Sequence, residues 1–453
     1  MSDDPMRIFL DSIGCRLNQS EIETMARQFR AAGHEIVASA AEADIAVINT
    51  CTVTSKAASD SRGKIRAAAR LGVDEIAVTG CWATLEPQAA AALPGVRRVV
   101  PNDRKDSLVA DILNLQPSTL RAEPQGEAFD LEPLTRVPLP GLRQRTRAFI
   151  KVQDGCDNHC TFCITAIARG AGRSRPIPDV LADIRAALAG GTKEIVLTGV
   201  HLGSWGQDLS TYPSGTMSLG AGLGLCLRDL VKTILNETDA PRLRLSSLEP
   251  WDLDADFFAL WQDARLCRHL HLPLQSGSAG VLRLMARKTT PEAYAALVES
   301  AREAIQDVAI TTDVIAGFPG ETEAEFTETL DFVRQMNFSG GHVFTYSARP
   351  GTAAARMGGQ IPHEVRKERN AALRAVFAEA AQMYRKKFIG VRMPVLWESA
   401  SQLSEWGWRV EGLTDNYLRV RAYAPEPRWN QVDAVCLTGL QDDGMTGKLI
   451  NTV

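Results

Sequence analysis

Short apolar runs alternate with amphipathic stretches along residues 1–100. The apolar runs are residues 6–14, 43–50 and 75–80, and the amphipathic stretches are residues 18–33, residues 59–70 and a stretch from Glu86. Runs of this kind predict strands, and apolar positions repeating about every three to four residues predict helices, the first of them ended by Gly33. Strands that alternate with helices form a parallel sheet covered on both faces. Residues 1–115 are therefore predicted to form an amino-terminal doubly wound parallel sheet.

The composition changes between residues 116 and 141. Five prolines fall here among acidic and small residues, namely Pro117, Pro124, Pro133, Pro138 and Pro140. Proline lacks the backbone N–H that helices and strands use, so residues 116–141 are predicted to be a linker or a loop lying across the surface.

A second series of strand-like runs begins at residue 148. The runs are residues 148–152, 194–199, 242–247, 269–273, 310–317 and 342–347, with helical patterns between most of them. Six strand–helix units fall short of the eight that close a full α/β barrel, so residues 142–387 are predicted to form a partial, open (βα)6 barrel. Residues 363–387 are predicted to end this region as one long basic helix.

After Phe388 the pattern changes to short β-like runs. The runs are residues 391–399, 408–413, 417–423 and 432–439. Several short strands in succession are typical of small barrels, and residues 388–453 are predicted to form a small antiparallel β-barrel of the OB-like kind.

Length and composition indicate a multidomain globular protein. The chain has 453 residues, enough for two or three domains, with 45% hydrophobic and 23% charged residues. No apolar run approaches the roughly 18 residues of a membrane helix, and the acidic amino terminus lacks the apolar core of a secretory signal. We therefore expect a cytoplasmic protein that does not enter a membrane. The net charge of -4 excludes a polycation, so any nucleic acid would be bound through local basic patches.

Nine cysteines form an odd set, which favours metal binding or redox chemistry over a complete disulfide framework. Three of them, the loop cysteines Cys156, Cys160 and Cys163, lie within eight residues shortly after the first barrel strand. Three thiolates would leave the fourth iron of a [4Fe–4S] cluster without a protein ligand and open to a chelating substrate. A structural zinc site is the alternative, but zinc normally takes four closed ligands in tighter pairs. His159 is better placed to face solvent than to complete such a set.

Three further cysteines, the amino-terminal cysteines Cys15, Cys51 and Cys81, each follow a predicted strand immediately. Loops at the carboxyl ends of neighbouring parallel strands converge on one crevice, so these thiols are predicted to hold a second cluster, again with one open iron. The alternative is three buried structural cysteines, a common fate of this residue type, which the repetition at three equivalent positions disfavours. The remaining cysteines, interpreted as structural, are Cys226, Cys267 and Cys436.

These cysteine patterns resemble those of one known group of enzymes. The Cys-x-x-x-Cys-x-aromatic-Cys pattern, with Phe162 as its aromatic residue, resembles the radical S-adenosylmethionine superfamily. The other set resembles the motifs of the tRNA methylthiotransferase family across essentially the whole chain, with Gly14-Cys15, Asn49-Thr50-Cys51 and Gly80-Cys81. The resemblance implies two [4Fe–4S] clusters, S-adenosyl-L-methionine, and an electron donor such as flavodoxin or ferredoxin. It also implies that the amino-terminal cluster supplies or carries the sulfur, while the other generates a 5′-deoxyadenosyl radical able to attack an unactivated carbon.

The resemblance extends to the carboxyl ends of the predicted barrel strands, where barrel enzymes bind ligands. The matching stretches are residues 197–201, 271–278, 313–320 and 346–351. Their position predicts contacts with S-adenosylmethionine from Thr198, Gly199, Gln275, Ser276, Phe318 and Pro319, the last two beside its adenine. Arg349 is interpreted either as facing an anionic group or as forming a salt bridge within its loop. No side chain is assigned a catalytic role.

Three basic clusters are candidates for contacts with the phosphates of an anticodon stem-loop. They are Arg143, Arg145 and Arg147; Arg169, Arg173 and Arg175; and Arg385, Lys386 and Lys387. The alternative for each is an ordinary solvated charged face. Aromatic residues able to stack on bases, or to fill the core of the small barrel, are Trp397, Trp406, Trp408, Trp429, Tyr417 and Tyr423.

The carboxyl-terminal region resembles the TRAM domain of RNA-modifying enzymes, and residues 412–420 resemble the branch of the family that acts on N6-threonylcarbamoyladenosine. The resemblance thus implies transfer of a methylthio group to C2 of that adenosine, on the 3′ side of the tRNA anticodon. Two alternatives within the family stay open: isopentenyladenosine in tRNA, and an aspartate of a ribosomal protein. An alternative of a different class is a non-catalytic iron–sulfur protein that binds RNA and senses oxygen or iron.

Overall fold

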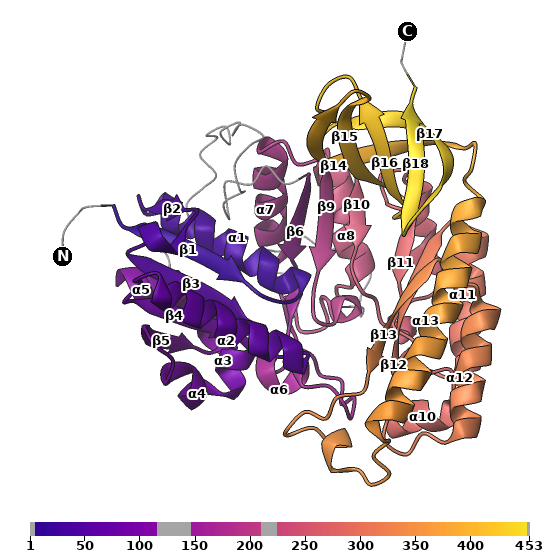
Figure 1. The fold of residues 1–453 in the computed structure, drawn as a ribbon, viewed down its shortest axis with the longest axis horizontal. Coiled ribbons are helices and arrows are strands. Elements are labelled where there is room, and N and C mark those ends of the chain that lie inside the picture. Colours follow the sequence, from indigo (N-terminus) through magenta and orange to yellow (C-terminus); the bar gives the residue numbers. More distant parts are fainter. Residues whose placement is uncertain (1–4, 116–145, 210–223, 451–453) are drawn as a thin grey trace.

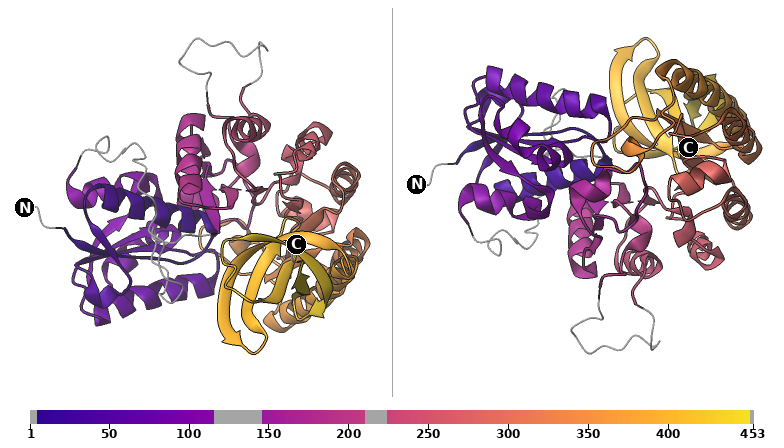
Figure 2. Two further views of the ribbon diagram at one scale, coloured as in Figure 1. Left: turned by 90° about the horizontal axis from the view of Figure 1, so that it is seen from above. Right: turned by 90° about the horizontal axis from the view of Figure 1, so that it is seen from below.

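The computed structural model describes residues 5–115, 146–209 and 224–450. The predicted linker at residues 116–141, together with Arg143 and Arg145, lies outside the described residues. The chain forms an amino-terminal sheet covered by helices, a central set of strands backed by helices, and a carboxyl-terminal β-barrel (Figure 1). The amino-terminal domain lies beside the central strands, and the β-barrel lies over one end of them (Figure 1 and Figure 2).

The amino-terminal sheet is parallel throughout, with the strand order β2-β1-β3-β4-β5. Its strands are β1 (Arg7–Ser12), β2 (Glu35–Val37), β3 (Ile45–Thr50), β4 (Ile76–Gly80) and β5 (Val96–Val100). Its helices are α1 (Arg16–Ala31), α2 (Ser55–Arg70), α3 (Cys81–Leu85), α4 (Pro87–Ala91) and α5 (Leu108–Leu113). One apolar cluster joins the sheet to α1 and α5, and another joins it to α2, α3 and α4. Both faces are covered, so the predicted doubly wound parallel sheet is confirmed.

Some boundaries in this domain differ from the sequence prediction. The edge strands β2 and β5 are not predicted, because β2 has three residues and β5 (Val-Arg-Arg-Val-Val) carries two arginines. The helix after β4 begins at Cys81 rather than Glu86, because Gly80 has a φ of 97° and turns the chain at once from strand to helix. Helix α1 likewise begins directly after Cys15. Two of the three amino-terminal cysteines therefore border the start of a helix.

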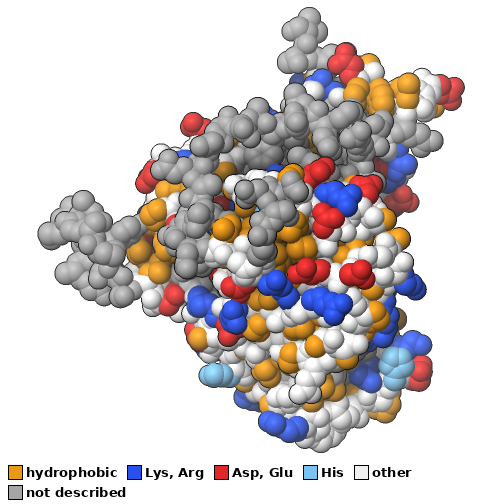
Figure 3. Space-filling model, turned by 90° about the vertical axis from the view of Figure 1, so that its left-hand side faces the viewer, with side chains coloured by type: hydrophobic (Ala, Val, Ile, Leu, Met, Phe, Trp, Pro, Cys, Tyr) orange, Lys and Arg blue, Asp and Glu red, His pale blue; other side chains and the backbone are white. Residues whose placement is uncertain are grey.

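Figure 3 shows the side of the molecule that lies to the left in Figure 1. Basic and acidic side chains are intermingled among the described residues on this side. Several cations of the amino-terminal domain are paired, such as Lys64 with Asp11 (2.6 Å). The visible described surface of this side therefore offers no continuous basic strip for RNA phosphates.

Within the described residues, six parallel strands form the barrel of the central region, as predicted. They are β6 (Arg147–Lys151), β9 (Glu194–Thr198), β10 (Leu243–Leu245), β11 (His269–His271), β12 (Ala309–Ala316) and β13 (Gly340–Thr345). They form two three-stranded sheets, β10-β9-β6 and β11-β12-β13, connected by a bridge between Ser247 and His271. Among the described strands, β13 does not pair with β6, so the barrel is partial and open.

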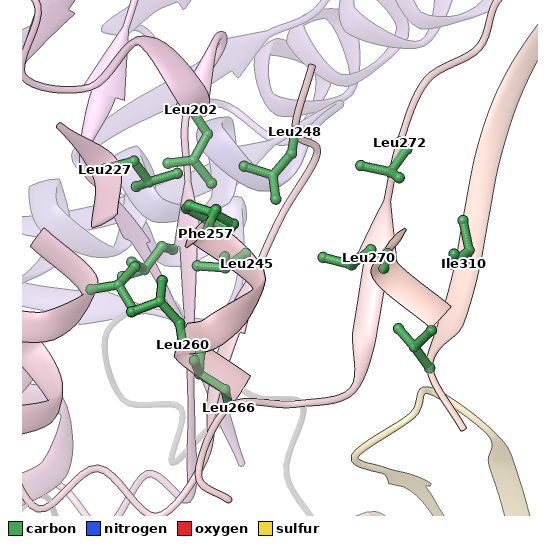
Figure 4. Close-up of a cluster of buried hydrophobic side chains, with 14 of the residues drawn as sticks. Leu202, Leu227, Leu245, Leu248, Phe257, Leu260, Leu266, Leu270, Leu272 and Ile310 are labelled. Carbon is green, nitrogen blue, oxygen red and sulfur yellow. The ribbon is translucent and has the colours of Figure 1, made fainter. Parts of the chain in front are cut away.

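Helices cover the outer face of these strands. They are α7 (Ile177–Ala189), α8 (Leu227–Glu237), α9 (Ala255–Phe258), α10 (Ala279–Leu284), α11 (Pro291–Ala304), α12 (Glu323–Met336) and α13 (His363–Lys386). Alternate strand residues, such as Leu245 and Leu270, point toward the helices and form an extensive apolar cluster (Figure 4). Each such side chain contributes about 1.5–3 kcal/mol by its burial. Within the described residues, no helix combines the length and apolar character needed to cross a membrane.

The inner face of the open barrel carries polar side chains. A Cβ at Gly341 would lie 2.4 Å from Phe377 of α13, so Gly341 faces the helices and its neighbour His342 faces inward. Asp313 of β12 pairs with His342 across the sheet, and its carboxylate lies 3.3 Å from His271 of β11. The inner wall is therefore suited to a polar ligand.

The carboxyl-terminal strands form a closed barrel in the order β14-β15-β16-β18-β17. They are β14 (Arg392–Ser404), β15 (Gly407–Thr414), β16 (Arg419–Ala424), β17 (Val432–Gln441) and β18 (Gly444–Leu449). The predicted small barrel is confirmed, although one pair, β16 with β18, is parallel and closes an otherwise antiparallel barrel. Trp397 is fully buried in its core, so this tryptophan cannot stack on RNA.

Candidate functional site

The amino-terminal cysteines come together at the carboxyl-terminal edge of their sheet. Cys15 precedes α1, Cys51 follows β3, and Cys81 opens α3 after β4. Cys51 and Cys81 are buried, whereas Cys15 is exposed. Burial raises the pKa of the Cys51 thiol, and the nearby Cys15 and Cys81 raise it further. The structure thus brings these residues close to one another, while their role as cluster ligands stays a prediction.

Gly14 allows this close approach. Its φ of 109° is favourable only for glycine, and a Cβ there would lie 2.6 Å from the Sγ of Cys51. The side-chain amide of Asn18 donates to the carbonyl oxygens of Ile13 (2.7 Å) and Thr50 (3.1 Å). The loops that carry Cys15 and Cys51 are therefore tied to each other as well as packed together.

The loop cysteines follow β7 (Gln153–Asp154), and all three are partly buried. The backbone N–H of Cys156 donates to the Gly170 carbonyl (3.0 Å), and that of Cys163 donates to the Cys160 carbonyl (3.0 Å). The chain then enters the short helix α6 (Thr165–Arg169). The loop is thus held at both ends by main-chain hydrogen bonds.

Aromatic packing supports this loop from behind. Phe162 meets Phe318 edge-on, with ring centroids 6.3 Å apart, and Phe318 meets Tyr346 at 5.5 Å. Phe318 is fully buried in this cluster. Its side chain therefore positions the cysteine loop and presents no open face to an adenine ring in this conformation.

The other predicted contacts with S-adenosylmethionine differ in accessibility. Gly199 and Gln275 keep part of their surface accessible. Thr198, Ser276 and Pro319 are buried, and the Ser276 hydroxyl is already bonded to a threonine hydroxyl of α12 (3.0 Å). A direct contact stays a prediction for each residue, and accessibility favours Gly199 and Gln275.

Arg287 lies beside the loop cysteines, and no spacing in the sequence singles it out. Its Nη1 lies 3.9 Å from the Sγ of Cys160, and its Nη2 donates to Glu249 (2.6 Å). The guanidinium also lies 4.5 Å from the ring centre of Trp251. Burial raises the pKa of the Cys160 thiol, while the Arg287 guanidinium lowers it. Arg287 thus favours the thiolate form that an iron ligand requires.

His201 supplies a second cation beside this loop. Its Nε2 lies 2.6 Å from Asp252 and its Nδ1 lies 3.2 Å from the side chain of Asn158. Burial lowers the pKa of His201, but hydrogen bonds with Asp252 and Cys156 raise this pKa to about 9. His201 ends one of the strand-end stretches that match the family pattern, and this position is the signal by which sequence reasoning could have found it.

A buried ionic network joins the two cysteine sites. Arg169, at the end of α6, donates to Glu21 (2.8 Å) and Asp154 (2.9 Å), and its side chain is 1% exposed. Lys105, in the short helix η2 (Asn102–Ser107), donates to the same Glu21 (2.7 Å). Against the upward effect of burial, Arg169 and Lys105 hold the pKa of Glu21 well below its usual range. The network therefore pairs buried cations with buried carboxylates that accept their hydrogen bonds.

The same network reaches the flanks of both sets of cysteines. Arg169 also donates to Asn18 (2.7 Å) in the first turn of α1. The side-chain amide of Asn102 donates to the Ala168 carbonyl of α6 (2.8 Å) and lies 3.7 Å from the Sγ of Cys81. The helix that follows the loop cysteines is thus bonded directly to segments that carry the amino-terminal cysteines. This bonding sets the position of one site relative to the other.

The prediction that Arg169 contacts RNA phosphates is wrong, because its side chain is buried in this network. Arg147 and Arg175 each form an ion pair with a carboxylate of the chain. The partners of Arg169 and Arg147, Glu21 and Glu398, are distant along the chain, so sequence alone does not separate these two arginines from free ones.

Other candidates for RNA contacts remain accessible. Arg173 is 47% exposed, and Lys386 and Lys387 are exposed at the end of α13. On the carboxyl-terminal barrel, Trp406 is 71% and Tyr423 is 50% exposed. These side chains keep the charge and the aromatic faces that phosphates and bases require.

The two sets of cysteines fit iron–sulfur clusters by the chemistry of their donors. All nine cysteines of the chain are free thiols, and cysteine thiolates are the usual ligands of [4Fe–4S] clusters. Across the described residues, no three His, Cys, Asp or Glu side chains are grouped to hold a single metal ion. Ligands of a cluster bind different irons, so their sulfurs need not meet at one point. A buried arginine near each set also offsets the negative charge of thiolates.

Two protein-family models match the chain. Residues 7–100 match the Uncharacterized protein family UPF0004, and residues 150–333 match the Radical SAM superfamily. The first range spans the amino-terminal sheet, and the second spans most of the open barrel. The second match implies a [4Fe–4S] cluster and S-adenosylmethionine as cofactors.

Named relatives align over most of the chain. The threonylcarbamoyladenosine tRNA methylthiotransferase MtaB of Bacillus subtilis (strain 168) is 36% identical over 416 residues, covering 90% of this chain and 88% of the relative. The protein of the same name from Thermotoga maritima is also 36% identical, with the same coverage. The tRNA-2-methylthio-N(6)-dimethylallyladenosine synthase of Sphingopyxis alaskensis is 36% identical over 86% of either chain.

Among solved structures, the radical S-adenosylmethionine methyltransferase TsrM from Kitasatospora setae, with cobalamin and a [4Fe-4S] cluster bound, has a TM-score of 0.56. The match covers 78% of this chain and 77% of that chain at 16% sequence identity. At this identity the likeness shows a shared fold and no more.

Proposed function

Because the chain belongs to the tRNA methylthiotransferase family of the radical S-adenosylmethionine superfamily, we propose that it transfers a methylthio group to C2 of N6-threonylcarbamoyladenosine in tRNA. The observation that carries the proposal is the 36% identity, over 90% of the chain, to relatives named for this activity. The proposed enzyme works in the cytoplasm, where its nine free thiols stay reduced.

In this proposal the two cysteine sites have different tasks. The loop cysteines hold one [4Fe–4S] cluster with an iron open to S-adenosylmethionine, and the amino-terminal cysteines hold a second cluster. When bound, these groups supply a 5′-deoxyadenosyl radical at the first site and sulfur for transfer at the second. The proposed domains are a sulfur-carrying domain of residues 1–115, a radical domain of residues 142–387 and an RNA-binding domain of residues 388–453. Residues 116–141 are the proposed linker.

The side chains around the sites have supporting roles. Arg287 and His201 place positive charge beside the loop cysteines, which favours their ionised form. Arg169 keeps the two sites at a constant separation. Accessible groups at the strand ends, Gly199 and Gln275, contact the cofactor.

The proposed partners are the anticodon stem-loop of tRNA and a one-electron donor such as flavodoxin or ferredoxin. The exposed Arg173, Lys386 and Lys387 contact phosphates, and Trp406 and Tyr423 stack on unpaired bases.

Mass spectrometry of tRNA digested after an anaerobic reaction tests the function. The reconstituted, reduced protein is incubated with S-adenosylmethionine and tRNA that carries threonylcarbamoyladenosine without the methylthio group. We expect the methylthio derivative of that nucleoside together with 5′-deoxyadenosine. Deoxyadenosine without any modified nucleoside would contradict the proposed substrate, and failure to cleave S-adenosylmethionine would favour a non-catalytic sensor.

Isopentenyladenosine is the second candidate substrate, because a synthase named for the dimethylallyl nucleoside is likewise 36% identical. A tRNA pool that contains both nucleosides separates the two candidates in one reaction. Methylthio product on isopentenyladenosine alone would replace the first proposal. No tRNA product, with a mass increase on a ribosomal protein instead, would favour the aspartate alternative.

A further inference from the structure

Residues 412–420, which resemble the threonylcarbamoyladenosine branch, place a side chain inside the open barrel. They span the end of β15 and the turn to β16, where Tyr417 has a φ of 67°. The Tyr417 ring stacks on His269 of β11, with centroids 4.3 Å apart and an interplanar angle of 7°. The guanidinium of Arg244 of β10 lies 5.0 Å from the same ring centre. His269 and Arg244 alternate with outward-facing leucines, so both lie on the inner face, and Tyr417 enters between them.

Tyr417 in turn holds Arg16, which comes from the other end of the chain. The Nη2 of Arg16 donates to the Tyr417 hydroxyl (2.9 Å), and its guanidinium lies 5.9 Å from the ring centre of Phe149 on β6. Phe149 faces inward, because its neighbour Ile150 belongs to the outer apolar cluster. Arg16 is the first residue of α1 and directly follows Cys15. Its side chain therefore reaches from the amino-terminal cysteine site into the barrel.

Arg16 differs from its neighbours Arg147 and Arg244 in having no carboxylate partner within the described part of the chain. Arg244 is paired with Glu194 (2.6 Å), and Arg147 is paired with Glu398. Arg16 is partly buried, and its hydrogen bond to Tyr417 uses one of the five N–H donors of a guanidinium. A partly desolvated cation with free donors is a favourable site for an anionic ligand.

We propose that Arg16, positioned by Tyr417, binds the carboxylate of the threonylcarbamoyl group and so selects this adenosine over one that carries an isopentenyl group. This inference rests on the proposed function. The N6 substituent of threonylcarbamoyladenosine ends in a carboxylate, which matches the planar fork of a guanidinium. The isopentenyl group is apolar, so it would displace water from the guanidinium without offering a hydrogen-bond acceptor in its place. Tyr417 is a positioning residue here, because it acts through Arg16.

Equilibrium binding of synthetic anticodon stem-loops to the full-length reconstituted protein tests the proposal. Four RNAs differ only at the N6 position: unmodified, isopentenyl, threonylcarbamoyl, and the methyl ester of threonylcarbamoyl, in which an added methyl group removes the negative charge. The proteins are the parent, Arg16→Met, Arg16→Lys and Tyr417→Phe. Arg66→Met is the matched control, because Arg66 is an exposed arginine of α2 in the same domain. Fluorescence anisotropy gives each dissociation constant without requiring turnover.

The parent is expected to bind the acid about 10- to 100-fold more tightly than the ester, the range of a hydrogen-bonded charge pair. Arg16→Met should remove this difference while leaving the affinity for the unmodified stem-loop unchanged. Arg16→Lys should keep part of it, and Tyr417→Phe should reduce it because the guanidinium loses its anchor. Arg66→Met should keep all of it.

Two results would overturn the proposal: equal binding of acid and ester by the parent, or an undiminished difference in Arg16→Met. Arg349 is the rival cation, since its Nε and Nη2 are buried without partners. Loss of the acid–ester difference in Arg349→Met but not in Arg16→Met would assign the carboxylate to Arg349 instead. Should Arg16→Met fail to fold, an unchanged difference in Tyr417→Phe also counts against the proposal.

The product assay separates this inference from the proposed function. Methylthio product on isopentenyladenosine alone removes the proposed function itself. Product on threonylcarbamoyladenosine, together with an acid–ester difference that survives in Arg16→Met, removes only the role of Arg16.

Discussion

The amino-terminal cysteines come from three separate strand ends, whereas the loop cysteines lie within one segment of eight residues. The first set depends on the register of three parallel strands and on the close approach that Gly14 permits. The second depends on main-chain hydrogen bonds of its own loop and on the packing of Phe162. A buried arginine lies near each set. Arg287 donates to Glu249 within the barrel, whereas Arg169 donates to carboxylates of both domains.

This difference separates two kinds of dependence. The cysteines of the loop site and the contacts of Phe162 and Arg287 that support it all lie within the open barrel, so this site should survive damage to the amino-terminal domain. The amino-terminal site is built by long-range contacts. Its proposed role in sulfur transfer further depends on the position in which the ionic network holds it relative to the loop site. Variants of the two sites should therefore differ in which activity they lose, and variants of the network should affect the coupling of the two.

The largest effect is expected for Cys160→Ala. Loss of one of three loop thiols should lower 5′-deoxyadenosine formation by more than about 100-fold, beyond the 10- to 100-fold typical of outer partners of a metal site. Methylthio product should disappear as well, because it needs the radical. Anaerobic assays with chromatography of both products measure this. Cys436→Ala is the matched control, since Cys436 lies in the small barrel. Parent-like deoxyadenosine formation by Cys160→Ala would disprove the assignment of the loop.

The next largest effect is a loss of methylthio product without loss of S-adenosylmethionine cleavage. The triple variant Cys15→Ala, Cys51→Ala, Cys81→Ala should bind about half the iron of the parent, if each set holds one four-iron cluster. It should still cleave S-adenosylmethionine, because all three loop cysteines lie in the open barrel, and should form no methylthio product. Iron analysis and mass spectrometry of tRNA check both points. Parent-level iron or parent-rate product would mean that these cysteines are structural.

A third, smaller effect is expected at the network. Arg169→Met leaves Glu21 and Asp154 buried without their main cation, which should lower the free energy of unfolding by about 3–5 kcal/mol. In the protein that remains folded, methylthio product should fall more than deoxyadenosine, because the separation of the sites is no longer held.

Arg173→Met is the control for that variant, because Arg173 belongs to the same basic cluster but is 47% exposed. Its unfolding free energy in urea should stay within about 0.5 kcal/mol of the parent. An equal ratio of the two products in Arg169→Met and the parent would show that the network stabilises the fold without coupling the sites.

The smallest effect is a dependence on acid pH. The pKa of Glu21 is held well below its usual 4.5, so its contribution to stability is complete above that value and is lost as pH falls through the lowered pKa. Between pH 4.5 and more acid conditions, the parent should lose up to about 1.4 kcal/mol per pH unit through this group. Glu21→Gln should be less stable at neutral pH but should show a flatter acid limb. Parallel curves of Tm against pH for the two proteins would contradict this.

Much of the fold could be predicted because its buried strands have nearly continuous apolar sequences. Every residue of β3 is buried, and its sequence Ile-Ala-Val-Ile-Asn-Thr is a clear strand signal. The edge strands β2 and β5 escaped prediction because short or half-exposed strands need no apolar run. The burial of Phe318 and Ser276 could not be predicted, because nothing in a strand-end motif says which of its side chains turn inward. Their contact with the cofactor stays a prediction.

The sequence by itself determined which cysteines are proposed as cluster ligands and how they divide into two sets. A thiol and its spacing to the next thiol are properties of the chain, and strand ends that carry thiols converge in any parallel sheet. Only the tertiary structure decided which charges accompany them. Arg169 resembled a free phosphate-binding arginine until Glu21, far away in sequence, proved to be its partner. Tyr417 resembled a surface aromatic until the small barrel was seen to insert it beside Arg16. A side chain's charge is encoded locally, but its solvation and its partner depend on which distant segments pack against it.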